Sequence, residues 1–391
     1  MPHPPTGGAS APSGSSASEK PREAPRVRHL IGLDAVRVFA TLLVLVIHAD
    51  HWPLQQSGAD LAVWNYCDLL SRSCVPIFVV LTGLLLTYRR QEHMHLRVFA
   101  RRRLGRSLLP WAFWLPIYTL IGLFLTFEVT RSWSGVVSWW LLGGGHLWYL
   151  ILVPQLYVCF QFWPEGLRAR WLLAAAAMAL QTALCLYRLY APQSAPLQGL
   201  FLAYGYEFFF FWIGYFAVGA AIGASLVRNV PRWPAWPFWL ATAAGGALLV
   251  GVQLSSADEA SFANGTGAFL RPLLPIMTIT VFAAVAISGE RLLRAYDWIR
   301  RPAVVLSRYS LGIYIVHEAL LYIPGRILAG PLLQRHLPLS AFGFALLVFV
   351  TLGLAYVVTR LIVATPLAIT VGLPPEPLRL PWRTADAAGE D

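Results

Sequence analysis

The segment IGLDAVRVFATLLVLVIHADHW, residues 31–52, is a long apolar stretch that contains Arg37 and His48. Because an α-helix has about 3.6 residues per turn, the two side chains are separated by close to three turns and project from nearly the same face. The rise of about 1.5 Å per residue separates them by about 16 Å along the axis. An ionisable residue inside a membrane span is costly and indicates a functional site facing a polar cavity.

The composition is that of a membrane protein. The chain has 391 residues, of which 57% are hydrophobic and 13% charged, and its mean hydropathy is +0.58. Soluble proteins contain about 45–50% apolar and about 25% charged residues. Apolar runs of about 20 residues, the length of a membrane span, recur throughout. We therefore predict an all-α, polytopic membrane helix bundle with about ten transmembrane helices.

The sequence divides into two tails and one transmembrane domain. Residues 1–29 are rich in Pro, Ser, Gly and Ala, and we expect a disordered tail. Residues 30–365 form the transmembrane domain, and residues 366–391 form a Pro-rich tail. The expected spans are 31–52, 69–88, 108–128, 146–163, 171–190, 201–226, 236–254, 270–289, 304–323 and 340–364.

The net charge of +11 comes mainly from arginines that cluster in short segments between the spans. With ten spans and a cytoplasmic N-terminus, the inner segments hold most of these arginines, including those of RRQEHMHLRVFARRRLGR (89–106). Because cytoplasmic loops are enriched in Lys and Arg, both termini are expected to be cytoplasmic. No base-recognition motif accompanies the charge, so we expect membrane lipid as a partner and no nucleic acid.

The first candidate site is formed by Asp34, Arg37 and His48. Asp34 lies one turn before Arg37 and can pair with it, which lowers the cost of burying the guanidinium. His48 would be a general base, since an unperturbed imidazole pKa of about 6.5 suits proton transfer near neutral pH. The alternative is that Arg37 reaches toward the inner interface and His48 only hydrogen-bonds within the bundle.

The second candidate site follows the second span. RVFARRRLGRSLLP (97–110) places Arg102, Arg103 and Arg106 at the inner surface, and the last two share a helix face. A forked guanidinium suits phosphate, so a phosphate-rich donor such as a coenzyme A thioester would fit. Membrane orientation or anionic lipid would also explain these arginines.

Two further segments combine histidine with aromatic residues. GGGHLWYL (143–150) presents His146, Trp148 and Tyr149 after three glycines that allow a tight chain reversal. These aromatic rings suit a sugar but are also ordinary interfacial residues. YSLGIYIVHEALLY (309–322) carries Tyr314 and His317 in an apolar run, and Glu318 follows.

Two other features have structural interpretations. In VPIFVVLTGLLL (75–86), Thr82-Gly83 would let another backbone approach the helix. Of the four cysteines, Cys67 and Cys74 would be about 10 Å apart on one helix, too far for a disulfide. The cysteines show no metal-ligand spacing, and we expect no metal.

The order of these motifs resembles the acyltransferase 3 family. The resemblance rests on R-x10-H in the first span, VPIFVVLTGLLL, R-x-x-R-x-x-x-P, GHLWYL and YSLGIYIVH, and covers roughly residues 30–365. It implies a ten-helix enzyme of the bacterial cytoplasmic (inner) membrane. Members typically move an acyl group, often acetyl, from cytoplasmic acyl-CoA to a sugar hydroxyl of an exopolysaccharide, lipopolysaccharide or glycolipid acceptor.

The resemblance also implies residue roles. His48 matches the essential histidine, Arg37 its paired arginine, and Arg103 and Arg106 the arginines thought to meet the donor. The family often has Arg-Gly, Ser-Gly and His-Pro where this chain has Arg37-Val38, Thr82-Gly83 and His317-Glu318.

We therefore expect an acyl-CoA-dependent O-acyltransferase in which His48 activates an acceptor hydroxyl. Direct transfer and an acyl-histidine intermediate are both compatible with the sequence. A multispan transporter of a small anionic or glycan-linked substrate is the alternative function, although the inverted repeats common in carriers are not visible. A structural or assembly subunit is a third class. No feature indicates an oligomeric state.

Overall fold

The computed structural model describes residues 29–49, 67–89, 96–126, 132–192, 194–205, 207–228, 233–255, 268–271, 273–324 and 341–377. Within these ranges every regular element is a helix. The principal helices are α1 (Gly32–Ala49), α3 (Cys74–Tyr88), α4 (Leu96–Ile121), α5 (Trp133–Leu141), α6 (Trp148–Phe160), α7 (Leu167–Tyr190), α8 (Gln198–Tyr204), α9 (Ile213–Arg228), α10 (Trp236–Ser255), α12 (Leu274–Ala295), α13 (Asp297–Pro324) and α15 (Ala341–Val363).

The expected membrane bundle is confirmed. In the described ranges, eight helical segments are long and apolar enough to span a membrane, and Ile213–Arg228 and Trp236–Gly251 are shorter apolar helices. Together they follow the order of the ten expected spans. Of the expected tails, all of residues 1–28 and 378–391 lie outside the described residues. Residues 366–377 are described, and their short helix Pro366–Val371 contacts α4 and α15.

The expected continuous sixth span, 201–226, is wrong. The chain there forms α8, a 3-10 turn at Phe209–Phe211, and then α9 from Ile213. The side chain of Gln155 satisfies the interrupted backbone: its Nε2 donates to the carbonyl oxygen of Glu207 at 2.7 Å, and its Oε1 accepts the N–H of Phe209 at 3.3 Å. A polar side chain from α6 thus supplies what a continuous helix would have supplied itself.

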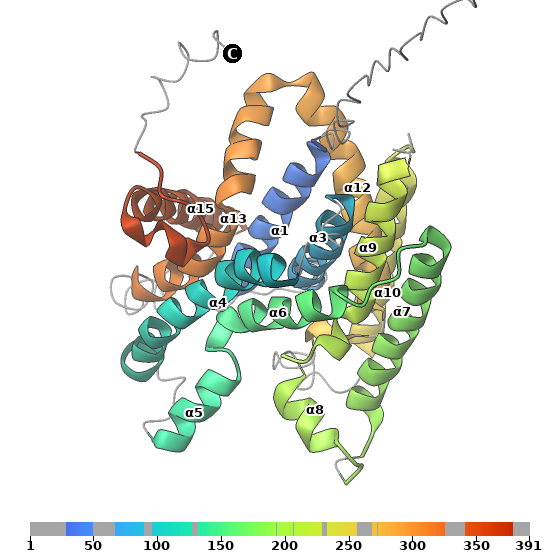
Figure 1. Cartoon of the computed structure of the whole chain (residues 1–391), viewed down its shortest axis with the longest axis horizontal. Coiled ribbons are helices and arrows are strands. Elements are labelled where there is room, and N and C mark those ends of the chain that lie inside the picture. The colour runs from blue at the N-terminus through green and yellow to red at the C-terminus, as the bar shows by residue number, and fades with distance from the viewer. Residues whose placement is uncertain are drawn as a thin grey trace, which may run out of the picture.

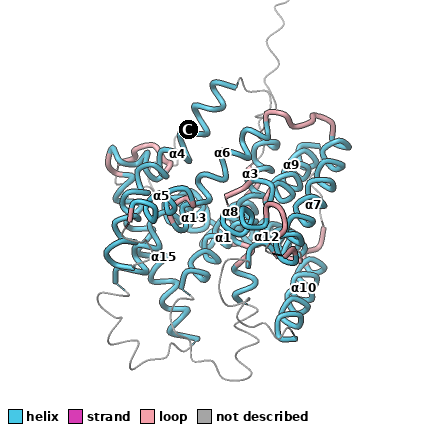
Figure 2. Tube along the Cα trace, turned by 90° about the horizontal axis from the view of Figure 1, so that it is seen from below, coloured by secondary structure: helices cyan, strands magenta, loops and turns pink. Residues whose placement is uncertain are grey.

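Helix α1 lies at the centre of the bundle. It contacts α3, α12, α13 and α15, and Figures 1 and 2 show it between α12 and α13 from two directions. Helices α4 and α6 contact each other and run at a steep angle to α3 and α9 in Figure 1. The first span is therefore surrounded by the elements that carry the other motifs.

Helices α3 and α9 meet backbone to backbone. A Cβ at Gly83 would lie 2.2 Å from the carbonyl oxygen of Phe216, and a Cβ at Gly219 would lie 2.0 Å from that of Val80. Gly219 and Gly223 are spaced as in the small-residue motifs that bring membrane helices close together. Another backbone thus approaches α3 at Gly83, as the sequence suggested, and it is that of α9.

We predict that Gly219→Ala destabilises the protein, because the added methyl group must push α9 away from α3. Overpacking of this kind costs about 1–3 kcal/mol. Thermal unfolding of the purified protein in detergent measures the effect. The matched control is Gly245→Ala on α10, where a Cβ would meet nothing within 4 Å. Equal melting temperatures for the two variants would contradict this account of the helix contact.

Candidate active site

Three histidines from separate parts of the chain surround one carboxylate. His48 lies near the end of α1, His146 lies in the 3-10 turn before α6, and His317 and Glu318 lie on α13. Nδ1 of His48 is 3.4 Å from Oε1 of Glu318, and Nδ1 of His146 contacts Oε2. The ring centroid of His317 is 4.9 Å from that of His48 and 5.2 Å from that of His146. We call these four residues the histidine–glutamate cluster.

The three glycines before His146 bring it into the cluster. Gly143, Gly144 and Gly145 all have positive φ angles, of 83°, 76° and 64°, which L side chains rarely adopt. The three glycines therefore form a turn between α5 and α6. It turns His146 toward α13, where the Tyr314 hydroxyl donates to the main-chain carbonyl of His146.

A tyrosine side chain binds the backbone of helix α13 where the cluster forms. The hydroxyl of Tyr118, on α4, donates to the carbonyl oxygen of Ile315 at 2.6 Å and accepts the N–H of Ala319 at 3.3 Å. These two backbone groups would be hydrogen-bond partners in an ideal helix. A side chain inserted at such a position bends or opens a helix. Nε2 of His146 also lies 3.2 Å from the Ile315 oxygen.

Hydrogen bonding assigns the proton position on the His317 ring. Nδ1 of His317 lies 2.6 Å from the carbonyl oxygen of Tyr314, so Nδ1 carries a proton and Nε2 carries a lone pair. That Nε2 is buried and has no hydrogen-bond partner among the described residues. Both nitrogens of His146 face acceptors, the Ile315 carbonyl and the Glu318 carboxylate. His146 therefore lies between the Ile315 carbonyl and the Glu318 carboxylate.

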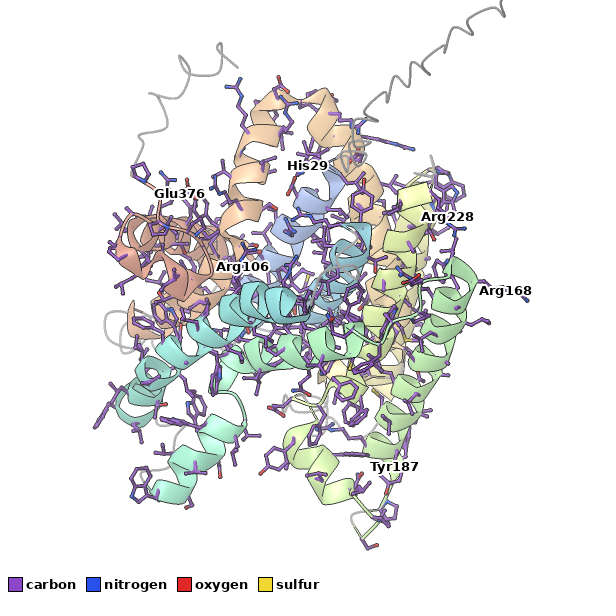
Figure 3. All side chains as sticks on the ribbon, in the orientation of Figure 1. His29, Arg106, Arg168, Tyr187, Arg228 and Glu376 are labelled. Atoms are coloured by element: carbon purple, nitrogen blue, oxygen red, sulfur yellow. The ribbon has the colours of Figure 1, made fainter. Side chains whose placement is uncertain are left out.

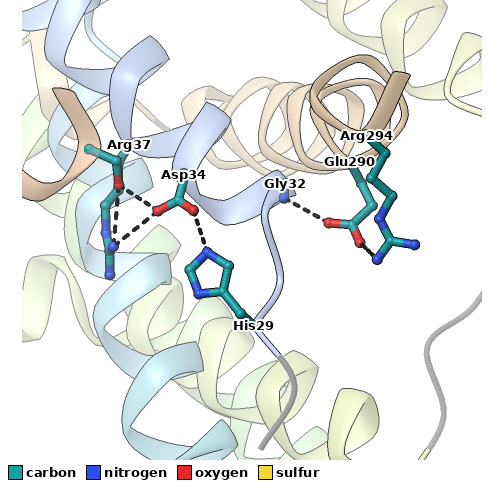
Figure 4. A network of polar contacts seen from close by, with 7 residues as sticks. His29, Gly32, Asp34, Arg37, Glu290 and Arg294 are labelled. Atoms are coloured by element: carbon teal, nitrogen blue, oxygen red, sulfur yellow. Dashed lines mark hydrogen bonds and ion pairs between the residues drawn. The ribbon is translucent and has the colours of Figure 1, made fainter. Parts of the chain in front are cut away.

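A second polar network lies near the first turn of α1. Oδ1 of Asp34 is 3.6 Å from the Arg37 guanidinium and accepts the Ser307 hydroxyl at 2.7 Å. Oδ2 of Asp34 lies 2.6 Å from Nε2 of His29. Figure 4 shows Asp34 between His29 and Arg37. The structure thus places Asp34 beside Arg37, as expected from their spacing, and ties both to α13 through Ser307.

The arginines after the second span lie on α4. Arg103 forms a hydrogen bond with the side chain of Tyr157 on α6. Arg106, labelled in Figure 3, is exposed one turn further along α4. Arg102 is in the same helix, but its side chain lies outside the described residues. Arg103 therefore contacts α6, and Arg106 follows it three residues later on the same helix.

Two tyrosines of α6 and one of α13 lie between the two regions. Tyr157 contacts Arg103, and Tyr149 lies two turns earlier on the same helix. The Tyr149 hydroxyl is 3.4 Å from Oγ1 of Thr82, and its ring centroid is 6.0 Å from that of Tyr314. The Tyr314 ring in turn lies 5.4 Å from the His146 ring. Tyrosine side chains thus lie both beside Arg103 and beside the histidine–glutamate cluster.

Trp148 takes a different direction from the other residues of its motif. Its ring centroid lies 5.2 Å from that of Trp212 and 6.2 Å from that of Phe269, away from the cluster. The structure therefore brings together five of the candidate side chains from three segments, and Trp148 is not one of them. These five are His48, His146, Tyr149, Tyr314 and His317.

Glu318 is the site residue that the sequence analysis did not single out. Its position beside His317 in an apolar run was a signal, because a carboxylate in a membrane span is as costly as a histidine. Tyr118 and Tyr157 were also missed. They are tyrosines within apolar segments, where nothing in the sequence separates them from core residues.

A family model described as an acyltransferase domain matches residues 30–360. The chain belongs to the acyltransferase 3 family. The match covers nearly the whole chain and confirms the resemblance seen in the motifs. As a member of the acyltransferase 3 family, the protein is a multi-pass membrane acyltransferase. No curated protein and no solved structure matches the chain significantly.

The acyltransferase 3 fold here also contains a buried acid outside the candidate spans. Glu207 lies between α8 and α9, its side chain is 8% exposed, and its Oε2 has no hydrogen-bond partner among the described residues. Burial raises the pKa of this carboxyl group to about 7, against smaller opposing effects from a backbone hydrogen bond and the charge of Arg188. The folded protein therefore favours the neutral acid.

We predict that Glu207 reduces stability as the pH rises. An unfolded chain ionises this group near its ordinary value of 4.5, whereas the folded protein holds the proton until about pH 7. The loss of folding stability caused by Glu207 is therefore absent below about pH 4.5, grows as the pH rises to about 7, and reaches its full size above that pH. Melting temperatures at pH 5 and pH 8 should differ less for Glu207→Gln than for the wild type. Exposed Glu165→Gln is the control, and a pH dependence unchanged in Glu207→Gln would contradict the burial argument.

Proposed function

We propose that this acyltransferase moves an acyl group, by preference acetyl, from cytoplasmic acyl-CoA to a sugar hydroxyl of an exopolysaccharide, lipopolysaccharide or glycolipid at the outer face of the bacterial inner membrane. His48 is the general base. The observation that carries this proposal is that His48, in a membrane-spanning helix of an acyltransferase, faces a carboxylate and two other imidazoles. A histidine serving only helix packing would not need such an environment.

In this reaction the imidazole of His48 acts first as a base and then as an acid. His48 removes the proton from the acceptor hydroxyl while that oxygen attacks the thioester carbonyl carbon. Collapse of the tetrahedral intermediate breaks the carbon–sulfur bond. The coenzyme A thiolate that leaves then accepts the proton held by the His48 imidazolium. The acceptor leaves as an ester and the donor as a free thiol, with no net change in the protein.

The donor would bind along α4 and α6. Arg102, Arg103 and Arg106 would hold the phosphates of coenzyme A through charge-assisted hydrogen bonds. Arg103 is oriented for this by its contact with Tyr157. The pantetheine arm would pass Tyr157 and Tyr149, with Arg37 near its path.

The acceptor would approach the cluster from the opposite side. Tyr314, His146 and His317 offer hydroxyl and imidazole groups next to His48, which suits hydrogen bonding to a sugar. Trp148 packs with Trp212 and Phe269, so it would meet the acceptor only as part of that aromatic group. Asp34 would act on the donor side, through the orientation of Arg37.

We predict that His48→Gln abolishes most transfer without affecting folding. A histidine base contributes about 10²–10⁴-fold to the rate, and glutamine cannot accept the proton. Radiolabel transfer from [14C]acetyl-CoA to the membrane glycan fraction of the producing cells measures activity, and size-exclusion chromatography in detergent monitors folding. Wild-type labelling by folded His48→Gln protein would reject His48 as the base.

We predict that Arg106→Ala raises the KM for acetyl-CoA with little change in kcat. A hydrogen bond to a charged group is worth about 1.5–3 kcal/mol, so the KM should rise about tenfold or more. Arg106→Lys should recover only part of this, because an ammonium group cannot form the forked contact. The control is Arg168→Ala at the start of α7 (Figure 3). An unchanged KM for Arg106→Ala would remove Arg106 from the donor site.

A further inference from the structure

We propose that Glu318 is a positioning residue that holds His48 in the tautomer needed for catalysis and stabilises its protonated form. This inference rests on the proposed function of His48. It is drawn from the arrangement of the four residues of the histidine–glutamate cluster, in which one carboxylate serves two imidazoles.

Glu318 differs from the other acidic residues of the candidate spans. Each of the others forms an ion pair with an arginine three or four residues along the chain. These pairs are Asp34–Arg37, Asp68–Arg72, Glu290–Arg294 and Asp297–Arg300. Arginine does not release its proton in proteins, so those arginines act as fixed positive charges. Asp34 in addition contacts Nε2 of His29 and accepts the Ser307 hydroxyl. Glu318 faces only histidines among the described residues, and histidine can gain and lose a proton near neutral pH.

The contact with His48 fixes where the proton of the resting imidazole lies. A carboxylate 3.4 Å from Nδ1 favours a proton on that nitrogen. The lone pair is then on Nε2, which becomes the atom that accepts the proton of the acceptor hydroxyl. When that proton arrives, the negative charge of Glu318 lies beside the new imidazolium and lowers the free energy of the charged state.

The contact with His146 keeps this carboxylate in place before the reaction. Glu318 is 8% exposed, and an isolated charge at such a position would be very costly. The contact with His146 gives the carboxylate a polar partner, and the contact between Nε2 of His146 and the Ile315 carbonyl holds the second ring. During turnover the hydroxyl proton moves to His48 and then to the thiolate, so Glu318 ends in its initial state.

Other contacts hold the turn of His146 against α13 without Glu318. The Tyr314 hydroxyl binds the His146 carbonyl, and Tyr118 binds the α13 backbone. A neutral replacement should therefore leave the fold largely intact. This separates a role in proton transfer from a role in packing.

The first test compares Glu318→Gln and Glu318→Asp with the wild type, using full-length protein in nanodiscs. The acceptor probe is the extracellular glycan fraction of the producing strain, and the rate is that of free thiol release from acetyl-CoA. For Glu318→Gln we expect kcat to fall about 100-fold with an unchanged KM for acetyl-CoA. Without the carboxylate the imidazolium is less stable, so the acid limb of the pH–kcat profile should move to lower pH. Glu318→Asp should recover part of the rate.

The control is Asp297→Asn, which removes an exposed carboxylate of the same helix. A Glu318→Gln variant with full kcat would overturn the proposal. So would a loss of kcat that accompanies a lower melting temperature while the midpoint of the acid limb stays fixed, because that pattern indicates a packing role.

The second test reads the tautomer without turnover. Nitrogen-15 NMR of histidine-labelled protein, with the His48 signals assigned by their loss in His48→Gln, should show a proton on Nδ1 and none on Nε2. In Glu318→Gln this preference should weaken. A wild-type His48 with its proton on Nε2 would overturn the positioning role of Glu318. Wild-type protein that shows the expected tautomer but transfers no acyl group would overturn the proposed function instead.

Discussion

The structure depends on the cost of placing ionisable groups inside a lipid bilayer, where each needs a partner within the protein. Glu318 meets this requirement for two histidines at once. Several unusual local features serve the same contact. Three consecutive glycines with positive φ turn His146 inward, and Tyr118 bridges two backbone groups of α13 beside the carboxylate. Features of this kind are costly in an ordinary helix bundle and are expected where geometry matters more than stability.

The rest of the bundle gives this cluster a rigid frame. Helices α3 and α9 pack through their backbones at Gly83 and Gly219, which leaves little freedom for either helix to move. Helix α1 is held to α12 and α13 near its first turn, where Glu290 accepts the N–H of Gly32 at 2.7 Å and Ser307 bonds Asp34. Both ends of the first span are therefore fixed, one by the Asp34 network and the other by the histidine–glutamate cluster.

The features that depend on one helix alone could be predicted from the sequence. The apolar runs gave the spans, and the spacing of Arg37 and His48 put both side chains on one face. The pairing of Asp34 with Arg37 is likewise local, because the residues lie one turn apart. The motif order was sufficient to recognise the family.

The features that depend on how helices rotate against each other could not be predicted. Glu318 is the centre of the site because α13 packs against both α1 and the turn that carries His146. The sequence does not show this packing. Trp148, two residues after His146, faces Trp212 because it is the first residue of α6, whereas His146 belongs to the preceding 3-10 turn. The break between α8 and α9 was missed because Gln155, which satisfies it, lies more than 50 residues earlier.

In the proposed reaction, one site within the membrane joins the donor arginines to the histidine–glutamate cluster. Cryo-electron microscopy of the protein in nanodiscs with a non-hydrolysable acetyl-CoA analogue would show where the donor binds. We expect the phosphates at Arg103 and Arg106, the pantetheine arm beside Tyr149, and the acyl carbonyl next to His48. A bound analogue whose acyl end lies away from His48 would rule out His48 as the base of this reaction.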